Sequence, residues 1–224
     1  MFSILKLLNV RLDKFLVLKG YFSSREKAKE AIKRGFIKVN GVVITKPSHE
    51  VSDRDSIEIL ISKPEKPRGY WKLMEIDTKW RIFDGDEVVL DLGSSAGGFL
   101  QYASERAKFV YGIEVSEKFR GTLKKIENER DNVKVFIDDA FKFNINKLPT
   151  LDLILLDMTL DPESSLKALK RFLPKLRENG KILFVAKIGK DSRIPDFKST
   201  GLEILDQVTS KRKKEIYILL AKRS

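Results

Sequence analysis

The stretch "VVLDLGSSAGGF", Val88 to Phe99, decides the fold of most of this chain. A short apolar run carries Asp91 and leads directly into a turn of Gly, Ser and Ala residues. A buried strand that ends in such a turn is typical of a doubly wound α/β sheet, in which ligands bind beyond the carboxyl ends of the strands. The stretch therefore predicts both a sheet and a ligand-binding loop at its edge.

The same rhythm continues along the chain after about residue 70. Segments of helical period, such as "SEKFRGTLKKIENE" and "DPESSLKALKRFLPKL", separate the apolar runs. These runs have the length of strands and lie at 88–92, 109–113, 133–137, 151–156 and 182–186. Apolar strands alternating with helices predict a parallel sheet covered on both faces, hence an α/β fold. The last two runs, "GLEILDQV" and "EIYILLA", predict a hairpin that closes the sheet.

The composition allows one ordinary domain and a small one. The chain has 224 residues, 42% of them hydrophobic, and no run approaches the roughly 18 apolar residues of a membrane span. The N-terminus lacks a signal-peptide cleavage site, so we expect an unexported, cytoplasmic protein without a membrane partner. The absence of cysteine excludes disulfides, zinc–thiolate sites and cysteine nucleophiles, and we expect no metal site.

Positive charge is concentrated at the beginning of the sequence. Residues 1 to 49 hold eleven Lys or Arg residues against three acidic ones, so this segment carries +8 of the formal net charge of +12. A phosphate backbone attracts clustered cations because each contact releases condensed counterions. The segment therefore favours a nucleic-acid partner. The alternative, a basic face that only keeps the protein in solution, remains open.

The local pattern of this basic segment predicts a small α+β module. "RLDKFLVLKG" has helical spacing and ends at Gly20, and "SSREKAKEAIKRG" begins with a serine cap and ends at Gly35. "FIKVNGVVI" predicts a hairpin around Asn40 and Gly41. "DSIEIL" predicts a closing strand.

Over about residues 10 to 60 this arrangement resembles the S4 RNA-binding domain. The stretches that carry the resemblance are "RLDKFL", "SSREKAKEAIKRGFIKVNG" and "VSDRDSIEI". The resemblance implies that basic residues of the two helices face structured RNA. We therefore expect RNA contacts from Arg11, Lys14, Arg25, Lys29, Lys33, Arg34 and Lys38. "SKPEKPRG" predicts a linker at residues 62–69, between an S4-like domain at 1–61 and a second domain at 70–224.

The loop after Val88 to Leu92 fits one class of cofactor better than another. A dinucleotide fingerprint would place a glycine where Ser95 stands, and Asp91 would repel a pyrophosphate. S-adenosylmethionine has an amino group and a sulfonium cation but no phosphate, so it suits the loop better. We expect cofactor contacts from Asp91, Gly93, Ser94, Ser95, Gly97, Gly98, Phe99 and Glu114. In the alternative interpretation the glycines only form a tight turn between a strand and a helix.

From Arg68 to Arg223 the chain looks like the FtsJ family of RNA ribose 2′-O-methyltransferases. The stretches "RGYWKLMEIDTKWRIFDGDEVVLDLGSSAGGFLQYASERA", "FIDDAF", "LILLDM", "ILFVAKIGK" and "KKEIYILLA" occur in the family's order. An S4 module ahead of such a domain resembles the layout of ribosomal RNA methyltransferases often labelled hemolysins. This resemblance implies a Rossmann-like, S-adenosylmethionine-dependent methyltransferase sheet. It implies ribosomal RNA or a ribosomal subunit as the partner, and no DNA is expected.

The family's Lys-Asp-Lys-Glu set corresponds here to Lys72, Asp157, Lys187 and Glu215. To act as a base, Lys187 would need a pKa lowered to roughly 7 or 8. A nearby Lys72 would lower that pKa and the two carboxylates would raise it, so the sequence leaves the sign open. Other roles remain open too. Lys72 could be a solvated helix lysine, and Glu203 competes with Glu215.

Asp157 could also cap the helix that follows it. "DPES" offers Asp161 with Pro162 behind it as a better cap. For the adenine contact the resemblance implies Asp139 rather than Asp138, because Asp139 holds the family's position before the small residue Ala140. It also implies a cofactor contact from Asp157. His49 is expected to be a surface loop residue.

The sequence departs from the FtsJ pattern in three places. Ser95-Ala96 stands for Ala-Pro in the loop, "IGKDSRIPDFKS" follows Lys187, and a Lys/Arg run precedes Glu215. The first is a small change that should leave cofactor binding intact. The other two alter the substrate side, so they affect which RNA is modified more than which reaction is run. Two alternatives stay open: a base methyltransferase, although "LDMT" replaces the Asn/Asp-Pro-Pro-aromatic loop of amino-group enzymes, and a non-catalytic RNA-binding or hemolysin-like protein.

Overall fold

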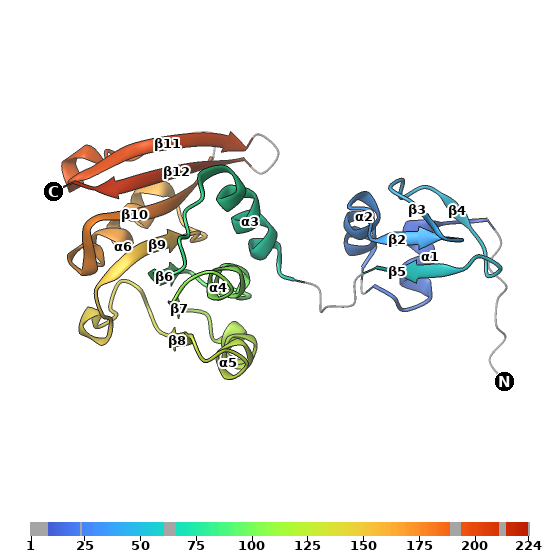
Figure 1. Cartoon of the computed structure of the whole chain (residues 1–224), viewed down its shortest axis with the longest axis horizontal. Helices are drawn as coiled ribbons and strands as arrows, with labels where there is room; N and C mark the ends of the chain where they lie inside the picture. The colour runs from blue at the N-terminus through green and yellow to red at the C-terminus, as the bar shows by residue number, and fades with distance from the viewer. Residues whose placement is uncertain (1–8, 23, 61–65, 189–193, 211–213, 224) are drawn as a thin grey trace. The chain divides into compact units, whose positions relative to one another are not determined.

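A computed structural model describes residues 9–22, 24–60, 66–188, 194–210 and 214–223. The chain divides into two compact units, Met1–Glu65 and Lys66–Ser224 (Figure 1). Residues 62–65 of the predicted linker lie outside the described residues. So do residues 189–193 and 211–213, which belong to two of the three places where the sequence departs from the FtsJ pattern. The last two residues of that linker, Arg68 and Gly69, already belong to helix α3, Arg68–Trp80.

The first unit is the expected small α+β module. Its elements are β1 (Val10–Arg11), α1 (Leu12–Leu18), α2 (Arg25–Lys33), β2 (Ile37–Val39), β3 (Val42–Val43), β4 (Glu50–Val51) and β5 (Ile57–Ile59). Strands β3, β2 and β5 form an antiparallel sheet, and β1 pairs with β4. The apolar stripes of α1 and α2 meet in one core with Ile37 and Val51.

Local chemistry explains the turns of this unit. The Ser24 side chain accepts a hydrogen bond from the Lys27 backbone N–H, so the predicted serine cap of α2 is confirmed. Asn40 and Gly41 have φ angles of 51° and 81°, the positive values that a tight two-residue hairpin requires. The predicted hairpin between β2 and β3 is confirmed.

The second unit is built on a seven-stranded sheet. Its strands are β6 (Val88–Leu92), β7 (Phe109–Glu114), β8 (Val133–Ile137), β9 (Leu151–Leu156), β10 (Leu176–Lys187), β11 (Leu202–Ser210) and β12 (Glu215–Lys222). Their order is β11-β12-β10-β9-β6-β7-β8. Strands β6 to β10 pair with one another in parallel. Strands β11 and β12 form an antiparallel hairpin, and β12 pairs antiparallel with β10. The parallel sheet and the closing hairpin are both as predicted.

Helices cover both faces of this sheet (Figure 1). One core contains α3, α4 (Gly98–Ser104) and α5 (Arg120–Asn128), and the other contains α6 (Pro162–Lys170). Val89 faces the first core, while Leu90 and Leu92 face the second. Successive residues of a strand point to opposite faces, so burial on both faces produces the near-continuous apolar runs.

Four short 3₁₀ helices complete the described part of the unit. They are η1 (Glu117–Phe119), η2 (Ile145–Lys147), η3 (Leu173–Lys175) and η4 (Lys198–Thr200). Within the described ranges of both units, no helix has the length and apolar character needed to cross a membrane.

The strand register brings the functional ends together. Leu92 of β6 lies beside Ile113 of β7 and Leu156 of β9, and Leu156 lies beside Phe184 of β10. Lys187, the last residue of β10, lies opposite Glu215, the first residue of β12. The carboxyl ends of the parallel strands therefore meet at one edge of the sheet, as expected for a ligand site.

Candidate active site

Four charged side chains gather at this edge from four separate elements. Asp157 follows β9 directly, Lys187 ends β10, Glu215 begins β12, and Lys72 lies on α3. They are the Lys-Asp-Lys-Glu set expected from the sequence, and the fold brings them into direct contact. Their sequence separations reach 143 residues.

Each carboxylate of the cluster contacts both ammonium groups. Lys72 Nζ lies 2.7 Å from Asp157 Oδ2 and 3.0 Å from Glu215 Oε2. Lys187 Nζ lies 2.6 Å from Asp157 Oδ1 and 2.7 Å from Glu215 Oε1. The side chain of Lys187 is 32% exposed and that of Lys72 is 12% exposed. Lys187 is therefore the more accessible of the two lysines.

The ion pairs set the protonation states. Burial alone would lower the pKa of Lys187, but Asp157 and Glu215 outweigh burial and hold that pKa above its ordinary value. Burial alone would raise the pKa of Asp157, yet Lys72 and Lys187 hold it below the usual range. The pKa of Glu215 is lowered in the same way against the effect of its burial. Near neutral pH the cluster thus contains an ammonium on Lys187 and two carboxylates.

Two alternatives weighed from the sequence, Glu203 for Glu215 and Asp161 as the helix cap, have their own partners outside this cluster. Glu203, the rival of Glu215, lies on β11 and pairs instead with Arg223 at 3.4 Å. Asp161 caps α6, since its carboxylate accepts a hydrogen bond from the Ser164 backbone N–H at 2.9 Å. The cap prediction is confirmed, and Asp157 lies with the lysines.

The glycine-rich loop has a backbone that ordinary residues adopt rarely. Gly93 and Gly97 have φ angles of 82° and 76°, and Ser95 has 50°. Glu114, at the end of β7, holds this loop: Oε2 accepts from the Ser95 N–H and Oε1 from the Ser116 N–H, both at 2.8 Å. The predicted ribose-binding carboxylate thus lies against the predicted cofactor loop.

Asp91 lies beneath the same loop in an unusual state. Its residue surface is 1% exposed, and Oδ2 has no hydrogen-bond partner, alone among the buried side-chain oxygens and nitrogens of the described residues. Burial raises the pKa of Asp91 to about 8. An unpaired buried carboxyl oxygen is costly, and a cationic donor would satisfy it. The loop therefore fits a cofactor that brings an ammonium group.

Asp139 follows β8 at the same edge. Its Oδ1 accepts from the Phe141 N–H at 2.9 Å, which shapes the loop after the strand. Arg171 donates to the carbonyl oxygens of Ala140 and Phe143, at 3.2 and 2.9 Å, and anchors this loop. The loop is thus held both by its own hydrogen bond and by those from Arg171.

The remaining loop residues face other parts of the protein. The Ser94 hydroxyl is buried and donates to the Asp91 carbonyl oxygen at 3.2 Å. Phe99 packs in the core, 4% exposed, and Gly98 faces the first turn of α3. Their assignment as cofactor contacts stays a prediction.

Several cations expected to contact RNA already have acidic partners in the first unit. Arg11 and Arg25 both bind Asp13, at 3.1 and 2.9 Å, and the side chain of Asp13 is fully buried. Arg34 pairs with Glu30 at 2.8 Å. Lys38 lies on β2 rather than on a helix and is 3.5 Å from Glu58. Lys14 and Lys33 are exposed, and Lys29 is half-buried.

Sequence reasoning missed two side chains that support these groups. Asp13 is the acid between Arg11 and Lys14 in "RLDKF", and its burial between two arginines could not be read from charge alone. Tyr217 donates its hydroxyl to Glu215 Oε2 at 3.2 Å. It lies two residues from Glu215 on the same strand, and that spacing was the available signal.

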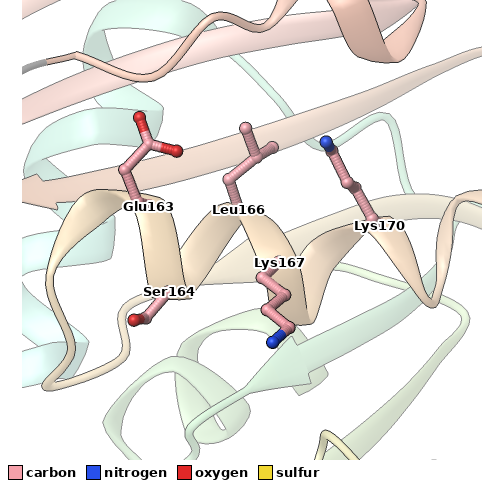
Figure 2. A pocket seen from close by; sticks show the side chains of 5 residues that line it. All are labelled: Glu163, Ser164, Leu166, Lys167 and Lys170. Carbon is pink, nitrogen blue, oxygen red and sulfur yellow. The ribbon is translucent and has the colours of Figure 1, made fainter.

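A depression on α6 lies apart from this cluster. It is lined by Glu163, Ser164, Leu166, Lys167 and Lys170, all from one helix (Figure 2). Figure 2 shows that these side chains project in different directions along the helix. They do not converge on a common point, so the depression offers no candidate active site.

The sheet, its covering helices and the glycine turn after β6 define a Rossmann-like methyltransferase fold. The FtsJ-like methyltransferase family matches residues 66–219, and the S4 domain matches residues 10–57. The chain therefore belongs to the FtsJ-like methyltransferase family and carries an S4 domain ahead of it. Both resemblances drawn from the sequence are confirmed.

Relatives of this chain have the same layout or part of it. Hemolysin A of Brachyspira hyodysenteriae is 34% identical over 139 residues, which are 62% of this chain and 56% of that protein. Ribosomal RNA large subunit methyltransferase E of Bdellovibrio bacteriovorus is 34% identical over 94 residues, 41% of this chain and 47% of that protein. The chain spans about half the length of these curated relatives.

A solved structure is similar along nearly the whole chain. It is that of a Streptococcus thermophilus protein with a hemolysin name. The similarity covers 97% of this chain and 90% of that one, with a TM-score of 0.57 and 18% sequence identity. At this identity it shows the shared fold alone.

Proposed function

We propose that this chain transfers a methyl group from S-adenosylmethionine to a ribose 2′-hydroxyl of structured RNA, in ribosomal RNA or a ribosomal subunit. Membership of the FtsJ-like family supports methyl transfer, and the S4 domain supports an RNA substrate. A relative named as a ribosomal RNA methyltransferase supports the choice of RNA. The observation that carries the ribose assignment is the Lys72–Asp157–Lys187–Glu215 cluster.

The cluster suits a hydroxyl nucleophile. A ribose hydroxyl attacks weakly, so the enzyme has to hold its oxygen in line with the methyl group and stabilise the charge that changes during attack. Lys187 can donate a hydrogen bond to that oxygen, since its side chain is the more accessible of the two ammonium groups. Asp157 and Glu215 fix the direction of both ammonium groups through short contacts.

The raised pKa of Lys187 supports one of two roles. A protonated amine cannot accept the hydroxyl proton, so Lys187 orients the oxygen and does not act as a general base. S-adenosylmethionine, when bound, would supply a methyl group on a positively charged sulfur, with a neutral thioether as the leaving group. The hydroxyl proton leaves late, once the new carbon–oxygen bond has made the oxygen strongly acidic, and a carboxylate or water suffices to accept it.

Three carboxylates at the ends of β6, β7 and β8 would hold the cofactor. Asp91 would pair with its ammonium group, Glu114 would accept from its ribose hydroxyls, and Asp139 would contact its adenine. The unpaired oxygen of Asp91 and the contact of Glu114 with Ser95 support this division. Gly93 links the loop to the catalytic cluster, since a Cβ there would lie 3.1 Å from Cγ of Met158, the neighbour of Asp157.

The position of the transferred methyl group tests this proposal. The full chain is incubated with ribosomal RNA and methyl-labelled S-adenosylmethionine, and the RNA is digested to nucleosides for mass spectrometry. We expect the label to remain with the ribose after glycosidic cleavage. Label that remains with the base contradicts the ribose assignment, and absence of label from both intact RNA and ribosomal subunits contradicts the substrate class.

A further inference from the structure

Gly98 lies where two helices come unusually close. A Cβ at this position would lie 2.6 Å from the backbone nitrogen of Tyr70 and 2.7 Å from Cα of Gly69. Real Cβ atoms do not approach backbone atoms this closely, so alanine cannot enter here unless α3 moves. The contact is mutual, since a Cβ at Gly69 would lie 3.3 Å from Cα of Gly98. Two glycines thus face each other where α3 meets the start of α4.

The other glycines of the loop face different neighbours. A Cβ at Gly97 would meet Ile126 of α5, and one at Gly93 would meet Met158. Gly98 is therefore the loop glycine whose contact is the backbone of α3.

The same turn of α3 is held to α4 by polar contacts. The Tyr70 hydroxyl donates to Glu105 at 2.7 Å, and Lys66 binds Glu105 at 2.8 Å. Further along α3, Asp77 accepts from the Tyr102 hydroxyl at 2.9 Å. These bonds hold α3 against α4, and the two facing glycines determine the distance between the helices.

Lys72 stands three residues after Gly69, within one turn of the crossing. Its ammonium must lie 2.7 Å from Asp157 and 3.0 Å from Glu215. We infer that Gly98 is a positioning residue for Lys72, because the Gly69–Gly98 contact sets the place of α3 and thereby that of the ammonium. This inference rests on the catalytic role proposed for the Lys72 cluster. It gives Gly98 a task other than admitting the cofactor.

Gly98→Ala in the full chain tests the inference through two separate readouts. We expect kcat for RNA methylation to fall about 100-fold, the effect of misplacing a group by about 1 Å, with the dissociation constant for S-adenosylmethionine unchanged. The two tryptophans of the chain, Trp71 and Trp80, both lie on α3, so their emission reports displacement of that helix. We expect the emission to change in Gly98→Ala.

Gly121→Ala is the matched control. Gly121 is a helical glycine of α5, and a Cβ there would meet nothing within 4 Å. This variant should retain the parent's kcat, cofactor affinity and emission. If Gly98→Ala does not fold, Gly69→Ala applies a milder push at the same contact and should show a smaller loss of kcat with the same unchanged cofactor affinity.

Each opposite result overturns the inference. Weaker cofactor binding with an unchanged kcat would show that Gly98 serves cofactor approach. A lowered kcat without a change in emission would show that Gly98 does not act through α3, and parental values throughout would show that the contact is unimportant. A fully active Lys72→Ala variant is a different failure, because it would contradict the proposed function itself.

Discussion

Asp91 and Lys187 are two charged residue types of one sheet whose pKa values are both raised, for opposite physical reasons. Asp91 is buried with one oxygen unpaired, and its pKa is raised to about 8. Lys187 is held as an ammonium by two carboxylates. One oxygen of Asp91 has no hydrogen-bond partner, whereas the Lys187 ammonium has two carboxylate partners. Both states are features that function explains better than stability does.

Asp91→Asn should stabilise the ligand-free protein. The unfolded carboxyl ionises above pH 4 or so, while the folded one stays protonated up to about pH 8, so stability falls as pH rises through this window. Above it the cost reaches about 6 kcal/mol at 1.36 kcal/mol per pKa unit. An amide left with unsatisfied groups costs about 1–3 kcal/mol, so we expect a net gain of a few kcal/mol at pH 8.

Urea unfolding of the parent and the variant at pH 5, 6, 7 and 8 measures this gain. The advantage of Asp91→Asn should grow with pH, and a constant difference would count against a buried, protonated Asp91. Calorimetric titration should also show weaker S-adenosylmethionine binding to the variant. Equal binding would remove Asp91 from the cofactor site.

The pH dependence of methyl transfer tests the role of Lys187. A group whose pKa is raised on folding keeps its stabilising charge below its unfolded pKa, 10.5, and loses it only as pH rises further. The single-turnover rate should therefore show no ionisation of Lys187 at pH values of roughly 7 to 8, where a lysine base would titrate. A rate that rises tenfold per pH unit below such a point, and loses that rise when Lys187 is replaced by Arg, would restore Lys187 as the base.

Secondary-structure elements supply the geometry that single residues cannot. The antiparallel pairing of β10 with β12 sets Lys187 opposite Glu215, and the parallel pairing of β9 with β10 sets Asp157 beside them. A one-residue slip of β12 would turn Glu215 to the other face of the sheet. The hairpin β11–β12 therefore does more than close the sheet, because it delivers one of the two carboxylates.

Asp161→Ala should lower the free energy of unfolding by about 1 kcal/mol, the usual effect of removing a helix N-cap. The residue caps α6 and stands apart from the cluster, so kcat should be unchanged. Denaturant unfolding together with a methylation assay checks both expectations. If the variant lost activity but kept the parent's free energy of unfolding, Asp161 would take part in the reaction as well as Asp157.

The sequence predicted elements well and contacts unevenly. Strands β6 and β9 and the second half of β10 were predictable because burial on both faces makes them almost continuously apolar. The caps at Ser24 and Asp161 are local signals. The raised pKa of Lys187 was not predictable, since it depends on partners 28 and 30 residues away whose distances only the fold sets. The facing of Gly98 toward α3 was hidden for the same reason. The pairing of the two-residue strands β1 and β4 has no periodic signal at all.

The two units of the molecule carry different features. The first unit contains the basic segment, residues 1 to 49, with +8 of the formal net charge of +12, and the FtsJ-like unit carries the charged cluster. Because Asp13 neutralises part of the charge of Arg11 and Arg25, the cations free to meet phosphate are fewer than the sequence suggests. We expect the first unit to contribute affinity and the second to contribute the reaction.

Replacing Arg25, Lys29 and Lys33 with Ala in the full chain should therefore raise KM for RNA and leave kcat at saturating RNA unchanged. The slope of log affinity against log salt should become shallower by about 2 if the three residues contact phosphates. Binding measured by fluorescence anisotropy over a range of salt concentrations checks this. An unchanged slope would mean that RNA is held elsewhere, and a lowered kcat would mean that the first unit also acts on the reaction.

The proposed function depends on the Lys72–Asp157–Lys187–Glu215 cluster, which we infer to carry out methyl transfer at the edge of the sheet. Single-turnover methylation of ribosomal RNA by Lys187→Ala, measured beside calorimetric titration with S-adenosylmethionine, tests it most directly. We expect methyl transfer to be abolished while cofactor affinity is retained. A variant that methylates at the parental rate would contradict it.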